Sequence, residues 1–170
     1  VGAEILIRPA QGRREPGSDE EILGALDLLD AARSDAINAN AGGMQGLIAL
    51  DRARALVAME QLESADTALA EARSLQPDDP ETRLLSATLL RRMNRLAEAQ
   101  AQIEEAARLA PLDPAIGVEA GVIAILDGRG EAARASWLSV TDTSPDSAEA
   151  AIARSYLDQL GPAPDTSPQP

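Results

Sequence analysis

The sequence lacks four residue types that carry much of enzyme chemistry. None of its 170 residues is cysteine, histidine, lysine or phenylalanine. Without histidine or cysteine the chain has no imidazole base, no thiolate nucleophile and no soft metal ligand. Without lysine it can form neither a Schiff base nor a lysine-containing phosphate loop. Carboxylates, hydroxyls and arginines remain, so we expect a protein that is not an enzyme and holds no cofactor or metal.

Aromatic residues and basic charge are also scarce. Only 1% of the residues are aromatic, whereas 34 are alanine. Alanine has the highest helix propensity and strand-favouring residues are few, which predicts an all-α core of small side chains. The formal charge of -13 argues against nucleic acid and anionic membranes as partners. No apolar run approaches the roughly 18 residues of a membrane span, so we expect no membrane insertion by this segment.

The composition bears weakly on the compartment. Arginine without lysine, together with abundant alanine, is typical of proteins from GC-rich bacterial genomes. The sequence begins with Val1 rather than methionine, as it would after removal of a leader. On that basis the bacterial periplasm or envelope is favoured over the cytoplasm.

The most informative feature is an internal repeat of 34 residues. Prolines, small residues and large apolar residues each recur at this spacing. The columns are Pro77, Pro111 and Pro145; Ala65, Ala99 and Ala133; Leu69, Ile103 and Trp137; Ala72, Ala106 and Val140; Leu62, Leu96 and Gly130; and Ala53, Ala87 and Gly121. Six columns in one phase argue against coincidence, and repeats of this length form solenoids.

Each unit reads as two antiparallel helices. Small and large apolar residues at i, i+3, i+7 and i+10 form one helix face, as in the stretch from Leu96 to Ala106. Asp79-Pro80 and Asp113-Pro114 are typical of an N-cap followed by proline in the first turn. The first helix of the second unit is expected from about Pro80 to Met93. Asn94 and Gly128 are expected at the turns between paired helices.

The segments outside the repeats have their own signals. Ser18 and Glu21 fit a capping box, and Ile22, Ala25, Leu29 and Ala32 predict an orphan second helix over residues 19–33. The stretch Ser34 to Gly43 is expected to be a connector, unless the helix continues to about Asn38. Residues 148–160 are expected to form a helix that caps the stack.

Both chain ends are predicted to be extended. Residues 161–170 contain four prolines and read as a tail. Residues 1–17 read as an extended segment, within which Ala3–Arg8 has strand character. This piece is either a tail or a segment that docks on an apolar helix surface.

A 34-residue helix-turn-helix unit with these columns resembles the tetratricopeptide repeat (TPR) family. Three units, 46–79, 80–113 and 114–147, cover 102 of the 170 residues and are preceded by an orphan helix and connector over 18–45. The family usually has large residues at the fourth and seventh positions of the first helix, where this chain has Ala49, Arg83 and Gly117, then Arg52, Ser86 and Ala120. The resemblance implies a right-handed α-solenoid of antiparallel helix pairs.

The resemblance also implies a function: binding of a peptide or protein segment in the concave groove lined by the first helices. The partner-binding positions that it indicates are Leu50, Arg54, Leu84, Thr88, Arg91, Arg92, Val118 and Val122. The subgroup that clamps a terminal carboxylate does so with lysines and asparagines, and none occurs at these positions. The competing hypothesis is a self-assembling scaffold, such as a homodimer joined through apolar groove and terminal surfaces.

Arginines among these positions suggest what the partner carries. Arg54, Arg91 and Arg92 would form a positive site for a segment with acidic and apolar side chains, because guanidinium binds carboxylate through two hydrogen bonds. Alternatively, these arginines neutralise nearby carboxylates such as Asp51 and Glu81.

Other apparent motifs have simpler explanations. Gly128-x-Gly130-x-x-Ala133 imitates a dinucleotide-binding turn, but the repeat accounts for all three residues. Adjacent acidic residues such as Asp78 and Asp79 point in different directions and are read as solvated. Trp137 is expected in the core, and Tyr156 either closes the core or lies exposed.

Overall fold

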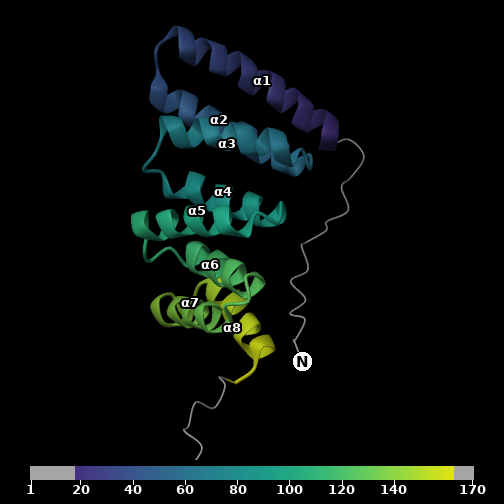
Figure 1. Cartoon of the computed structure of the whole chain (residues 1–170). Helices are drawn as coiled ribbons and strands as arrows, with labels where there is room; N and C mark the ends of the chain where they lie inside the picture. The colour runs from purple at the N-terminus through teal and green to yellow at the C-terminus, as the bar shows by residue number, and fades with distance from the viewer. Residues whose placement is uncertain (1–17, 163–170) are drawn as a thin grey trace, which may run out of the picture.

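The computed structural model describes residues 18–162, and every regular element in this range is an α-helix (Figure 1). The helices are α1 (Ser18–Asn38), α2 (Gly42–Ala58), α3 (Leu62–Leu75), α4 (Pro80–Arg92), α5 (Leu96–Leu109), α6 (Pro114–Leu126), α7 (Gly130–Thr143) and α8 (Ala148–Leu160). The expected all-α solenoid is confirmed. Ala3–Arg8, the side chain of Ser18 and residues 163–170 lie outside the described part.

Successive helices pack into pairs, and the pairs stack into a column. The closest packing joins α2 with α3, α4 with α5, and α6 with α7, while α1 packs on α2 and α8 packs on α6 and α7. Figure 1 shows the column running from α1 at one end to α8 at the other. None of the helices in residues 18–162 is long and apolar enough to span a membrane.

The predicted helix starts and turns are confirmed. The carboxylates of Asp79 and Asp113 accept hydrogen bonds of 2.9 Å from the backbone N–H groups of Thr82 and Ala115. Asn94 and Gly128 have φ values of 59° and 75° at the turns between paired helices. Glu60, in the same column, has a φ of 60°. Since a non-glycine residue rarely adopts this conformation, the turn geometry is imposed by the repeat.

The 34-residue columns form the core between helices. Ala65, Ala99 and Ala133 are each 0% exposed, and the large column of Leu69, Ile103 and Trp137 is equally buried. A residue without a side chain beyond Cβ lets two helix backbones approach, and the large residue fills the adjacent space. The small and large columns therefore hold the paired helices together.

The sizes of the small and large columns compensate each other in the third pair. Trp137 is the bulkiest residue of its column, and the matching small position holds Gly121 instead of alanine. A Cβ on Gly121 would lie 2.1 Å from Nε1 of Trp137. The indole N–H instead donates to the carbonyl oxygen of Val118 at 3.2 Å. Trp137 is thus a core residue, as expected.

Helix α1 follows the alternative expectation for its length, in which the helix continues to about Asn38. Ser34–Gly43 is not a connector, because α1 continues to Asn38 and α2 begins at Gly42. Ala36 is 2% exposed, so packing against α2 keeps this stretch helical. Of the predicted face, Ile22, Leu29 and Ala32 are half-buried, whereas Ala25 is exposed and Leu26 packs on the core in its place.

Helix α8 covers the far end of the column. Ala150 and Ala153 are 0% exposed, and Ser147 caps the helix by accepting from the N–H of Ala150. The ring centroids of Tyr156 and Trp137 are 5.0 Å apart. Of the two alternatives for Tyr156, closing the core is the one observed.

A substitution of Gly121 by alanine tests the compensation between columns. The added Cβ must displace the indole of Trp137, so Gly121→Ala is expected to destabilise the protein by about 1–3 kcal/mol. Urea denaturation monitored by circular dichroism measures this change. Gly130→Ala is the matched control, because its Cβ would meet only Ile125 at 3.9 Å. Equal losses for both variants would contradict this packing.

Candidate functional site

The outward sides of α2, α4 and α6 form one surface, which we call the first-helix surface. The first helices follow each other in space, because α4 contacts α6 and α6 contacts α8. An ion pair between Arg54 and Glu81 joins α2 to α4. All eight residues that the sequence indicated for partner binding lie on these three helices.

Two of those residues are inaccessible to a partner. Leu50 is 2% exposed in the core between α2 and α3, and Val122 is 3% exposed in the core around Trp137. The first helices are rotated about their axes relative to the expected orientation. The repeat pattern defines the buried face of the first helices less sharply than that of the second helices. Leu84, Thr88 and Val118 are half-buried and keep part of their side chains at the surface.

The three arginines of the predicted site all bind carboxylates of the chain itself. Arg54 donates to Asp51 at 2.6 Å and also to Glu81. Burial lowers the pKa of Arg54, but these two hydrogen bonds outweigh it and raise the pKa above its usual value. Arg92 donates to Glu60 at 2.8 Å. These contacts correspond to the alternative expectation, in which arginines neutralise nearby carboxylates.

The pair of Arg91 and Glu119 is the most protected of these contacts. Nε of Arg91 lies 2.6 Å from Oε1 of Glu119, and the two side chains are only 20% and 12% exposed. The pair joins α4 to α6 as Arg54 and Glu81 join α2 to α4. Glu119 was not among the predicted residues, because its distance of 28 residues from Arg91 does not match the repeat. The ion pairs leave the middle of the surface nearly neutral.

Apolar side chains remain exposed toward both ends of this surface. Met44 and Leu47 of α2 are 59% and 55% exposed, and Leu126 of α6 is 48% exposed. Leu47 shares a helix face with Arg54, since the two are seven residues apart. Leu126 and Glu119 are likewise seven residues apart in α6, so both leucines lie on the helix faces that carry the ion pairs.

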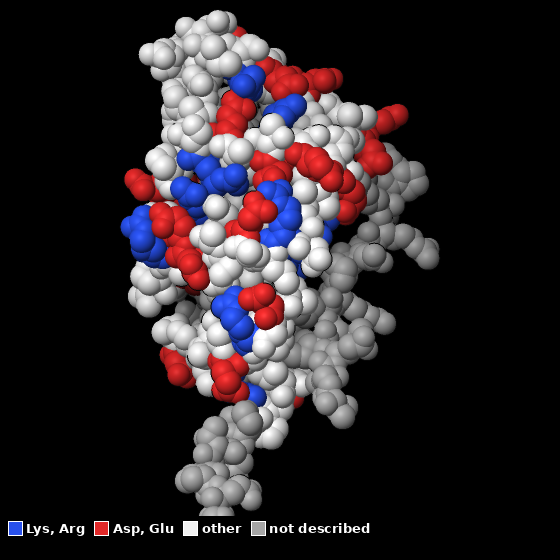
Figure 2. All heavy atoms as spheres, in the orientation of Figure 1, with Lys and Arg blue, Asp and Glu red and all other residues white. Residues whose placement is uncertain are grey.

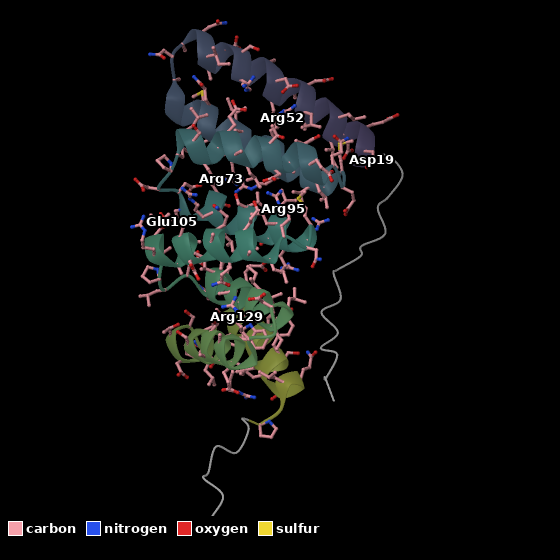
Figure 3. All side chains as sticks on the ribbon, in the orientation of Figure 1. Asp19, Arg52, Arg73, Arg95, Glu105 and Arg129 are labelled. Carbon is pink, nitrogen blue, oxygen red and sulfur yellow. The ribbon has the colours of Figure 1, made fainter. Side chains whose placement is uncertain are left out.

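The second helices of the three pairs are α3, α5 and α7, and α3 and α5 are also joined by ion pairs. Arg95 lies between Asp66 and Glu98, with N–O distances of 2.5 and 2.6 Å. Figure 3 labels Arg95 at the level between α3 and α5, and Figure 2 shows acidic and basic side chains interspersed over this face. Within residues 18–162 no group of three or more carboxylates is placed to hold a metal ion.

Together, the paired helices, the stacked pairs and the continuous first-helix surface define an α-solenoid of the helical-repeat class. Comparison with solved structures is more specific: the chain has the tetratricopeptide repeat fold. The Arabidopsis OM64 TPR domain matches with a TM-score of 0.64 at 14% identity, over 69% of this chain and 98% of that domain.

Two further solved structures extend the likeness. The first TPR of Spaghetti (RPAP3), bound to the HSP90 peptide SRMEEVD, matches with a TM-score of 0.63 at 16% identity, over 68% of this chain and 89% of that one. YrrB, described as a TPR protein with an unusual peptide-binding site, matches with a TM-score of 0.60 at 20% identity, over 81% of this chain and 86% of that one. Neither models of protein families nor curated protein sequences give a match.

Double-mutant cycles test the ion pairs of the first-helix surface. We expect a coupling free energy of about 1.5 kcal/mol or more between Arg91 and Glu119, because both side chains are largely shielded from water. Arg54 and Glu81, which are 42% and 63% exposed, should couple by less than about 1 kcal/mol. Substitutions to glutamine and urea denaturation provide both values. A weaker coupling for the shielded pair would contradict the assignment.

Acid titration tests the pair of Glu98 and Arg95. Hydrogen bonds from Arg95 lower the pKa of Glu98 below its usual 4.5, against an opposing effect of desolvation. A carboxylate with a lowered pKa stabilises the fold above its unfolded pKa, and this contribution is lost as the pH falls through the folded pKa. NMR titration of the Glu98 carboxyl carbon should give a midpoint below 4.5 that rises in Arg95→Gln. An unchanged midpoint in that variant would refute the pairing, and Arg129→Gln serves as the control.

Proposed function

We propose that the protein is a non-catalytic protein–protein interaction module whose first-helix surface binds a peptide or protein segment. The observation that carries the proposal is the exposure of Leu47 and Leu126 on one surface, with an ion-paired and nearly neutral middle. A fold shared with one peptide-bound TPR structure, and with a TPR protein described as having a peptide-binding site, supports it. The sequence has no histidine, cysteine or lysine, so only carboxylates and hydroxyls could supply a catalytic base or nucleophile.

The charge pattern points to a mainly apolar partner segment. A partner carboxylate that approached Arg91 would have to displace Glu119, which is 12% exposed. Breaking such a shielded contact leaves a charge uncompensated and is costly. Arg54 is more open, so a partner's acidic side chain can add to its pairs near the α2 end. Leu47, Leu84, Val118 and Leu126 then receive the apolar side chains.

The experiment starts with capture of a partner from the native organism and continues with the purified pair in a calorimeter. Leu47→Glu combined with Leu126→Glu should weaken binding at least about tenfold, because two exposed apolar contacts are lost. Leu138→Glu is the matched control, since Leu138 is 45% exposed on α7, outside the surface. Equal affinity of the double variant and the wild type would contradict the proposal.

A self-assembling scaffold is the second candidate function. The observation that favours it is the exposure of Leu23, Leu28 and Ile37 on the terminal helix α1, at 50%, 74% and 49%. Light scattering over a range of concentrations separates the two candidates. A monomer leaves the first-helix surface free for a foreign partner, whereas a dimer dissociated by Leu28→Glu would establish the scaffold.

A further inference from the structure

A depression lies between the second helices α3 and α5, with Leu90 of α4, which is 3% exposed, contributing to its lining. Its volume is about 390 Å³. Figure 3 places Arg73 and Arg95 at this level of the column. The lining includes Asp66, Arg73, Leu90, Arg95, Glu98 and Gln102.

Arg73 is the unusual member of this lining. Its Nη1 donates to Oγ of Ser86 at 2.7 Å, and Ser86 is 0% exposed. Among residues 18–162 Arg73 forms no ion pair, so four of the five guanidinium N–H groups have no protein acceptor. Burial lowers the pKa of Arg73, and Arg83 and Arg95 act in the same direction against Asp66. The described residues therefore leave the positive charge of this arginine without a carboxylate partner.

The repeat shows that the fold does not require arginine here. The residues 34 and 68 positions after Arg73 are Ala107 and Thr141. Arg83, which borders the same place, has the small Ala49 and Gly117 as its counterparts. Both arginines are thus confined to the junction of the first two pairs. An internal structural role common to the repeats does not explain them.

The remaining lining defines the size and charge of the ligand group. Oε1 of Gln102 accepts from Arg83 at 3.0 Å, which leaves its amide N–H groups available as donors. Ala70, Leu90 and Ala101 are apolar walls. Asp66 and Glu98 border the depression but are occupied by Arg95. They would repel a dianionic phosphate more strongly than a single carboxylate.

We propose that this depression is a second binding site, which takes one carboxylate group of a peptide on the guanidinium of Arg73. The carboxylate is either an acidic side chain or a chain terminus. Its two oxygens accept the free N–H groups of Arg73 in a bidentate contact, and the adjoining residue lies against the apolar walls. The site is separate from the first-helix surface, so both can be occupied at once.

The test is an NMR titration of the full chain with short peptides. An acetylated and amidated Ala-Leu-Glu-Ala tetrapeptide offers a side-chain carboxylate, and acetylated Ala-Leu-Gln-Ala with a free C-terminus offers a terminal one. Acetylated and amidated Ala-Leu-Gln-Ala has none. We expect saturable shifts of amides in residues 66–73 and 95–102 at about 1–10 mM for one or both carboxylate peptides, and none for the third.

Variants on the two sides of the site make the test specific. Arg73→Gln should weaken binding at least about tenfold while circular dichroism stays unchanged, and Arg129→Gln should have no effect. Glu98→Gln should strengthen binding severalfold, because it removes a repelling charge and frees Arg95 as a donor. Since Glu98 lies on the exposed side of α5, this variant keeps the fold even if Arg73→Gln does not.

The peptide titrations and the variants each have a result that supports the site and a result that overturns it. A response to only one carboxylate peptide supports the site and identifies the source of the carboxylate. Absence of shifts at about 20 mM, or equal binding by Arg73→Gln and wild type, would overturn the proposal. Weaker binding by Glu98→Gln, or stronger shifts with inorganic phosphate than with acetate, would overturn the assignment of a carboxylate ligand.

Discussion

The whole molecule depends on how closely the two helices of each pair approach each other. Ala65, Ala99 and Ala133 are fully buried at this contact, where any longer side chain would force the backbones apart. The large column fills the space that the small column leaves. In the third pair the balance shifts to Gly121 and Trp137, where the indole takes the space that a Cβ at position 121 would need. With almost no aromatic residues elsewhere, a chain rich in alanine can thus build a continuous core.

A regular stack in turn determines which side chains meet between repeats. Once the first helices lie side by side, Arg54 reaches Glu81 and Arg91 reaches Glu119. These ion pairs neutralise the arginines that would otherwise attract an acidic ligand. We propose that the exposed leucines are then the main recognition features of the first-helix surface. Between α3 and α5, Arg73 keeps free donors because Ser86 offers it only one acceptor.

Much of the fold could be predicted from the sequence, because proline, small and large residues recur in one phase. The helix starts at Pro80 and Pro114, the turns at Asn94 and Gly128 and the burial of Trp137 all follow from that pattern. The rotation of the first helices could not be predicted, because the sequence around Leu50 and Val122 does not indicate which side of the helix is buried. Ion pairs such as that of Arg91 with Glu119 could not be predicted from the sequence either. They join different repeats, and their spacing along the chain depends on the geometry of the solenoid. For α1, the burial of Ala36 against α2 decided the extent of the helix, and a short polar stretch does not reveal tertiary packing.

We propose that the partner binds to the first-helix surface through its exposed apolar ends. Photo-crosslinking tests it most directly, with a photoreactive amino acid placed at position 47, 126 or 112 in turn. All three positions hold exposed leucines, but Leu112 lies in the turn between α5 and α6. We expect the purified partner to crosslink from positions 47 and 126 and not from 112. Crosslinking from 112 alone would contradict it.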